Sequence, residues 1–247
     1  MTPLDWMLLS VIVLAAGVIR GCIGFGFSSL VVASSTLFLA PAEVVPMVAL
    51  LEIVASIHMA FSTWRDAARK TLFYMLIGAA VATPLGVYIL VLLPADTLRL
   101  LVSLMILVLS LLLASGWQYR GKTGPATYVG LGLVSGVCNG AAAVGGLPVA
   151  AFLTATNLSM KSLRATLVLF FFATDIILIL SASGHGLFTH ALLLQSALMV
   201  LPMAIGIQFG GLLFARLPEQ RLRRGVIGLL LLLALIGLSR AALQLLV

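Results

Sequence analysis

The chain has 247 residues, of which 62% are hydrophobic and only 9% are charged, and its mean hydropathy is +1.25. Soluble domains carry about 25% charged residues, and no soluble fold of this length could bury so much apolar surface. The formal net charge of +7 would suggest a nucleic-acid partner in a soluble protein, but here Lys and Arg lie in short loops, where they act as orientation signals. The composition therefore predicts a multi-pass membrane protein with no nucleic-acid partner.

The first half of the chain opens with an apolar segment at 4–20, which ends in Arg20 and lacks the basic start of a cleaved signal peptide. A glycine-rich stretch, GCIGFGFSS, follows at 21–29, and a short apolar piece covers 30–40. A helix needs about 20 apolar residues to cross the hydrocarbon core. Three helices of roughly this length are predicted next, at 42–61, 71–93 and 98–116.

The second half follows a polar linker, WQYRGKTG, at 117–124. An apolar piece at 125–138 meets the small-residue stretch NGAAAVGG at 139–146, and a short apolar piece follows at 147–155. Three long helices are again predicted, at 161–182, 188–214 and 222–245. The order of segments in the first half therefore recurs.

Residues recur as well as hydropathy. The run Leu93-Pro94 to Leu98-Arg99 matches the run Leu217-Pro218 to Leu222-Arg223, and Gly86 falls on Gly210 at the same offset. We therefore predict two homologous transmembrane repeats, 1–116 and 125–247, joined by a cytoplasmic linker at 117–124. Chance similarity among Leu, Gly and Ala is the alternative. An internal repeat of this kind is typical of secondary transporters.

The positive charges predict the topology. Lys and Arg are concentrated at 62–70, 117–124 and 215–224 and at the start of 161–182, which places these regions in the cytoplasm and both termini outside it. Residues 125–156 must then enter and leave the membrane on the same side. A helix of about 14 residues rises roughly 21 Å, which is short of a core about 30 Å thick.

The predicted fold is therefore all-α, and each half is a broken or re-entrant hairpin plus three transmembrane helices. Three is an odd number, so the halves are expected to be inverted relative to each other. The alternative is eight plain spans with parallel halves, in which each hairpin crosses as a single broken helix.

The two hairpin tips are the first candidate for a substrate site. Non-helical backbone inside a bilayer survives only where protein or a watery cavity surrounds it, and free amides at half-helix N-termini favour anions. The alternative is that small residues only let helices pack closely. The candidate substrate-binding residues at the tips are Gly24, Phe25, Gly26, Ser28, Ser29, Asn139, Gly140, Gly145 and Gly146.

Arg20 ends the first apolar segment, and Glu52 and Asp175 are the only acids well inside the predicted apolar helices. Charges inside a membrane are costly and are usually functional. The planar guanidinium of Arg20 suits an oxyanion; alternatively Arg20 pairs with Glu52 or reaches the membrane surface. The two acids are candidates for carrying a coupling ion. No HExxH, P-loop or GxSxG motif is present, so we expect no enzyme, no cofactor and no metal site.

The pattern G-x-x-G-F-G-F-S-x-L at 21–30, the second glycine-rich broken segment at 136–148, and the closing pattern of Gly210 followed by L-P-x-x-x-L-R at 217–223 resemble the sulfite exporter TauE/SafE family. This family includes the toluene sulfonate uptake permeases. The resemblance covers nearly the whole chain and implies a duplicated inner-membrane permease for sulfite, sulfonates or related organic anions. The stretch NGAAAVGG is richer in Ala than the Gly run that is usual at this place in the family.

Residues and resemblance together predict a secondary carrier for a small organosulfur or carboxylate anion in the cell inner (plasma) membrane, working by alternating access around two glycine-rich broken helices at mid-membrane. A passive anion channel and a non-transporting scaffold subunit are the alternatives. Protons or sodium as the coupling ion, and assembly of the chain into a homo-oligomer, stay open.

Overall fold

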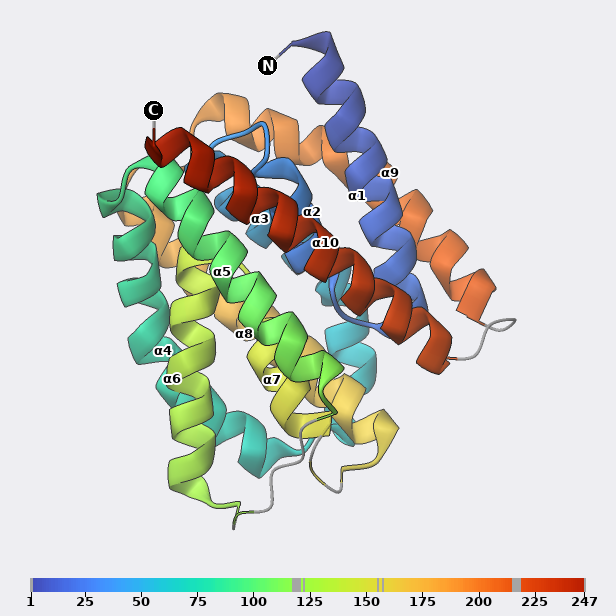
Figure 1. Ribbon diagram of the computed structural model, residues 1–247. Coiled ribbons are helices and arrows are strands. Elements are labelled where there is room, and N and C mark those ends of the chain that lie inside the picture. The colour runs from blue at the N-terminus through green and yellow to red at the C-terminus, as the bar shows by residue number, and fades with distance from the viewer. Residues whose placement is uncertain are drawn as a thin grey trace.

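The computed structural model describes residues 2–116, 121, 123–154, 156, 158–214 and 219–246. These residues form ten α-helices and one short 3-10 helix, with no strand among them (Figure 1). The first half contains α1 (Pro3–Ile23), α2 (Phe27–Ser35), α3 (Pro41–Thr63), η1 (Trp64–Asp66), α4 (Arg69–Leu92) and α5 (Ala95–Ala114). The second half contains α6 (Pro125–Ala142), α7 (Gly146–Thr154), α8 (Met160–Gly184), α9 (His190–Phe214) and α10 (Glu219–Leu246).

Local sequence signals set several helix starts. Pro3, Pro41 and Pro125 each occupy the first turn of a helix, where the missing N–H costs no hydrogen bond and the fixed φ suits the helix. Thr2 and Asp5 form a reciprocal capping box at the start of α1, with the Thr2 N–H donating to Asp5 Oδ2 at 2.7 Å. Such caps satisfy amides that the helix itself leaves free.

Six helices in the described part of the chain are long and apolar enough to cross a membrane: α1, α4, α5, α8, α9 and α10. By contrast, α2 and α7 have nine residues each, a rise of roughly 13 Å. Each half therefore contains a long first helix, a short returning helix and three further long helices. This confirms the predicted all-helical architecture with several membrane-length helices.

The first arm of each hairpin is longer than the sequence predicts. The expected helices at 4–20 and 125–138 run on to Ile23 and Ala142, so the interruptions narrow to 24–26 and 143–145. Gly, Ala and Cys continue a helix in a membrane when a neighbouring helix packs closely against them. Much of each predicted tip is therefore helical.

Helix α1 packs along α9, from the opposite half of the chain. A Cβ on Gly21 would overlap with the carbonyl of Ile207, and a Cβ on Gly210 would overlap with that of Val18. The thiol of Cys22 donates to the Gly210 carbonyl at 3.2 Å. The two backbones thus approach as closely as small residues allow.

Helix α6 packs in the same way along α4, from the first half. A Cβ on Gly132 would overlap with the carbonyl of Met75, and one on Gly140 with that of Thr83. The remaining long helices pair as α3 with α8 and α5 with α10. Every one of these pairs joins an element of one half to an element of the other.

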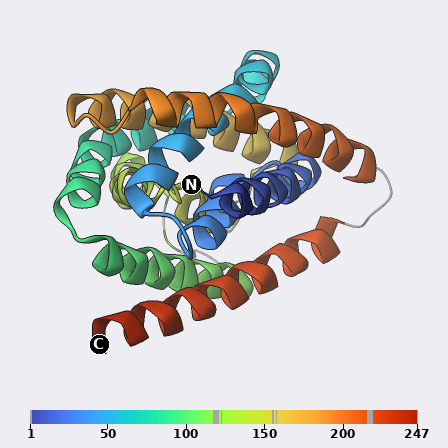
Figure 2. The ribbon, with the colours of Figure 1, turned by 90° about the horizontal axis from the view of Figure 1, so that it is seen from above.

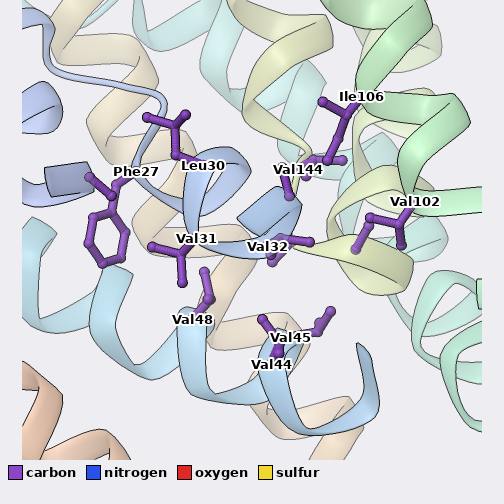
Figure 3. Packing of buried hydrophobic residues seen from close by; sticks show 14 of the residues in the cluster. Phe27, Leu30, Val31, Val32, Val44, Val45, Val48, Val102, Ile106 and Val144 are labelled. Atoms are coloured by element: carbon purple, nitrogen blue, oxygen red, sulfur yellow. The ribbon is translucent and has the colours of Figure 1, made fainter. Parts of the chain in front are cut away.

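The short helix α2 lies in the core, where Phe27, Leu30 and Val31 pack with valines of α3, and Val32 lies towards α5 and the α6–α7 break (Figure 3). Arg99 of α5 lies at the C-terminal end of α2. Its side chain donates to the carbonyls of Thr36 and Leu39 at 3.0 and 3.3 Å. This cation complements the partial negative charge at the helix C-terminus.

The two hairpins open at opposite ends of the molecule. Helix α1 begins and α10 ends at one end, whereas α6 begins at the other (Figure 1). Seen along this direction, the long helices surround the short ones (Figure 2). Each break therefore lies deep in the structure, where side chains from several helices surround it.

Candidate functional site

The break between α1 and α2 is built by two glycines with positive φ. Gly24 (φ 81°) ends α1 and Gly26 (φ 92°) caps α2, and this left-handed conformation costs other residues about 1–2 kcal/mol. Phe25, between them, is partly buried. It packs against two groups of buried hydrophobic residues, one that includes Phe27 and one that includes Phe170. Ser28 is partly buried and Ser29 is buried, and both lie in the first turn of α2, which begins at Phe27.

Arg164 lies against this break. A Cβ on Gly24 would come within 2.9 Å of Arg164 Nε, and that nitrogen is buried with no hydrogen-bond partner. Arg164 lies in the second turn of α8 and counts in the sequence as an orientation signal. Its contact with the first tip is a feature that the charge pattern alone does not predict.

The break between α6 and α7 has different chemistry. Ala143 takes the left-handed conformation (φ 51°) that Gly takes in the first break. Ser135 donates its hydroxyl to the Gly145 carbonyl at 2.5 Å, and a Cβ on Gly146 would come within 2.5 Å of the Phe171 ring. Gly140 lies on the face of α6 that packs on α4, so its small size serves helix packing.

The two breaks contact α8 at different heights. Gly24 touches Arg164, whereas Gly146 touches Phe171, about two turns further along the same helix, a rise of roughly 10 Å. The buried polar residues near the two breaks make up the candidate site.

Arg20 and Glu52 form a buried ion pair between α1 and α3. The distance from Arg20 Nη1 to Glu52 Oε2 is 2.7 Å, with 1% and 3% of the two side chains exposed. Arg20 Nη2 donates to Ser56 Oγ at 2.7 Å, and Ser56 lies one turn after Glu52 on α3. Arg20 Nε has no hydrogen-bond partner. This is the pairing that the sequence offers as the alternative to an anion site.

Asn139 and Asp175, both from the second half of the chain, lie near the Arg20–Glu52 pair. Asn139 Nδ2 donates to Asp175 Oδ1 at 3.0 Å, and both residues are buried. Asp175 Oδ2 has no donor. Asp175 also lies within electrostatic range of both Glu52 and Arg20. The structure thus brings together four predicted site residues from α1, α3, α6 and α8, and it adds Ser56.

The charges of the buried cluster do not balance. This cluster is defined as Arg20, Glu52, Ser56, Asn139 and Asp175. It holds one guanidinium and two carboxyl groups. Glu52 and Asp175 are each followed by Ile and lie at nearly the same distance before the repeated Leu-Pro motif. Each half therefore supplies one acid from its third helix.

Buried charges between broken helix pairs, within a bundle of membrane-length helices, define a polytopic membrane protein built to handle a polar solute. Residues 9–236 match the family model of the sulfite exporter TauE/SafE. The chain therefore belongs to this family of membrane transporters. No curated protein and no solved structure matches it.

Proposed function

We propose that this chain is a secondary carrier for a small anion, such as sulfite, a sulfonate or a related organosulfur or carboxylate anion. The observation that carries the proposal is Arg20, a buried guanidinium in which neither Nε nor Nη1 makes a hydrogen bond, although Nη1 lies in ion-pair contact with Glu52. Arginine recognises oxyanions through pairs of adjacent donors. Membership of the sulfite exporter family supports the same substrate class.

We propose further that the two halves, 1–116 and 125–247, are inverted repeats joined by a cytoplasmic linker at 117–124. The reciprocal contacts support this arrangement, because α1 packs on α9 as α6 packs on α4. The hairpins also open at opposite ends (Figure 1). Exchange of the two repeat conformations would then open the cluster to each side in turn, which is alternating access. The membrane is the cell inner membrane.

Within this proposal the first break, with Gly24, Phe25, Gly26, Ser28 and Ser29, forms the path from one side. The path from the other side runs past Asn139, Gly145 and Gly146. Glu52 and Asp175 are the candidates for coupling transport to an ion. Assembly with further copies of the chain is compatible with this proposal.

The test is transport by the purified protein reconstituted in liposomes, with sulfite, an alkanesulfonate, thiosulfate and acetate as substrates. A carrier gives saturable uptake of at least one of these, which depends on Arg20 and is lost in Arg20→Gln. Empty liposomes and Arg99→Gln, whose arginine lies at the outer end of α2, serve as controls. No uptake with protein that binds none of the four anions would favour a scaffold, and uptake without saturation would favour a channel.

A further inference from the structure

We infer that Glu52 occupies the substrate's place on Arg20, so that a monoanion binds only as Glu52 takes up a proton. The inference rests on the proposed function and deepens it, because it names the charge class of the substrate and the group that couples it to protons. It is carried by the geometry of the pair and by the charges of the buried cluster.

The geometry of the pair differs from a fully satisfied structural ion pair. Glu52 meets Arg20 through a single nitrogen at 2.7 Å, Ser56 takes the second, and Nε has no acceptor. A guanidinium binds carboxylates and related oxyanions most strongly through two adjacent donors. An oxyanion that replaced Glu52 could accept from two adjacent donors of Arg20, whereas Glu52 contacts only one nitrogen.

The charges restrict what can bind. The described contacts place Arg20 from α1 and Asp175 from α8 beside Glu52. Arg164, also on α8, lies against Gly24 but is partly exposed to solvent, so it is outside the buried cluster. Lys161 at the start of α8 pairs with Asp66. Asp96 and Arg99 pair with each other at the start of α5, and the described parts of α2 and α9 carry no acid or base beyond His190, the first residue of α9. His58 lies further along α3, and its side chain is outside the described residues.

A net charge held away from water costs several kcal/mol. With Arg20 charged, the cluster is neutral when the two acids together hold one proton. A bound monoanion makes it negative unless the second acid is protonated too. The anion therefore displaces the Glu52 carboxylate from Arg20, and Glu52 takes a proton from the aqueous side that the anion entered from. No bond other than this O–H forms, and the anion and proton move as a neutral pair.

The same count disfavours dianions. A dianion on Arg20 leaves one negative charge uncompensated even when both acids are protonated, because Arg20 is the one cation of the buried cluster. The substrate class is therefore a monoanion with at least two oxygen atoms, such as a sulfonate, hydrogen sulfite or a carboxylate.

The experiment measures proton uptake when methanesulfonate, a monoanion, binds to the purified full-length protein, by calorimetry in buffers of different ionisation enthalpy. Sulfate, a dianion, is the comparison. We expect uptake of one proton for each methanesulfonate bound. The affinity for methanesulfonate should fall about tenfold for each unit that the pH rises, in the range where the proton must be taken up. Sulfate should bind more than about tenfold more weakly than methanesulfonate. Methanesulfonate binding without proton uptake, or equally tight sulfate binding, would overturn the inference.

The variants Asp175→Asn and Glu52→Gln/Asp175→Asn differ only at residue 52. We expect the first to keep uptake of one proton per anion and the second to lose it. Proton uptake that persists in the double variant would also overturn the inference. If the double variant does not fold, infrared difference spectra of the wild type and of Asp175→Asn test whether Glu52 takes up the proton. We expect the band of protonated carboxyl groups to grow in both when methanesulfonate is added. An unchanged band would mean that Glu52 does not take up the proton.

The proposed function fails in a different way. If neither methanesulfonate, sulfate nor any anion of the liposome panel binds, then the carrier proposal is wrong, and this inference with it. If an anion binds without a proton, only the inference is wrong.

Discussion

We predict that stability and function both depend on Arg20. Its side chain is 1% exposed and pairs with Glu52, so removing either partner leaves a buried charge without compensation. Breaking such a pair typically costs about 3–5 kcal/mol, whereas removing both partners is close to neutral. Stability and binding should therefore respond differently to single and double substitutions.

We predict that Arg20→Gln lowers the thermal stability of the purified protein and abolishes anion binding. Arg20→Gln/Glu52→Gln should recover most of the stability, because no unpaired charge remains, but should not recover binding. Thermal unfolding in detergent and calorimetric titration with methanesulfonate measure the two effects. Anion binding by the stable double variant at the affinity of the wild type would remove Arg20 from the site.

Ala143 is the one non-glycine residue with positive φ among those described, and it caps the C-terminus of α6. We predict that Ala143→Gly stabilises the protein by about 1 kcal/mol, since glycine avoids the left-handed strain. Ala142→Gly, one residue earlier and still helical, should destabilise it. Thermal unfolding of both variants checks the pair, and a lower midpoint for Ala143→Gly would contradict the strain argument.

At the scale of elements, the first break combines backbone strain with a side-chain contact. Gly24 and Gly116 both have positive φ, but a Cβ on Gly24 meets Arg164 whereas one on Gly116 meets nothing within 4 Å. The two glycines therefore form a matched pair for separating the two effects.

We predict that Gly24→Ala and Gly116→Ala each lose about 1 kcal/mol of stability from the left-handed conformation, and that only Gly24→Ala also impairs transport. The larger Gly24→Leu, Gly26→Leu and Gly145→Leu should abolish transport and leave protein in the membrane. Liposome uptake and thermal unfolding provide the measurements. Normal transport by Gly24→Ala would mean that the first break has no part in the solute path.

The sequence predicts the elements well because long apolar runs separated by charged or glycine-rich stretches have few other interpretations. All six long helices of the prediction outside the hairpins are present, with ends that shift by a few residues. The breaks are narrower than predicted, because whether a Gly-Ala-Cys run stays helical depends on a partner helix that the local sequence does not identify.

The candidate site is predicted in part. Arg20, Glu52 and Asp175 are recognisable as charges in apolar segments, and the Arg20–Glu52 pair is one of two alternatives that the sequence offers. The bond between Asn139 and Asp175 joins residues on separate helices of the second half, and the contact of Arg164 with Gly24 joins the two halves. Contacts of this kind follow from tertiary packing, which no spacing along the chain reveals.

At the scale of the whole molecule, the charge distribution makes a prediction about orientation. We predict that both termini lie outside the cytoplasm and that 62–70, 117–124 and 215–224 lie inside, because Lys and Arg concentrate there. Labelling of single cysteines, introduced in a background without Cys22 and Cys138, by a membrane-impermeant reagent measures this. A C-terminus that is protected from outside but labelled after permeabilisation would contradict the inverted arrangement.

The close contact between α1 and α9 has a consequence for how the protein is made. α1 leaves the ribosome before the other described helices, yet α9, which covers its glycine face, leaves after all of them except α10. During most of synthesis this face must be covered by lipid or by another protein, and α1 cannot take its final position until the second half has entered the membrane. The order is reversed for α6, because its partner helix α4 is synthesised before it. Assembly of the first hairpin is therefore a late event that closes the molecule, whereas the second hairpin can dock as soon as it emerges.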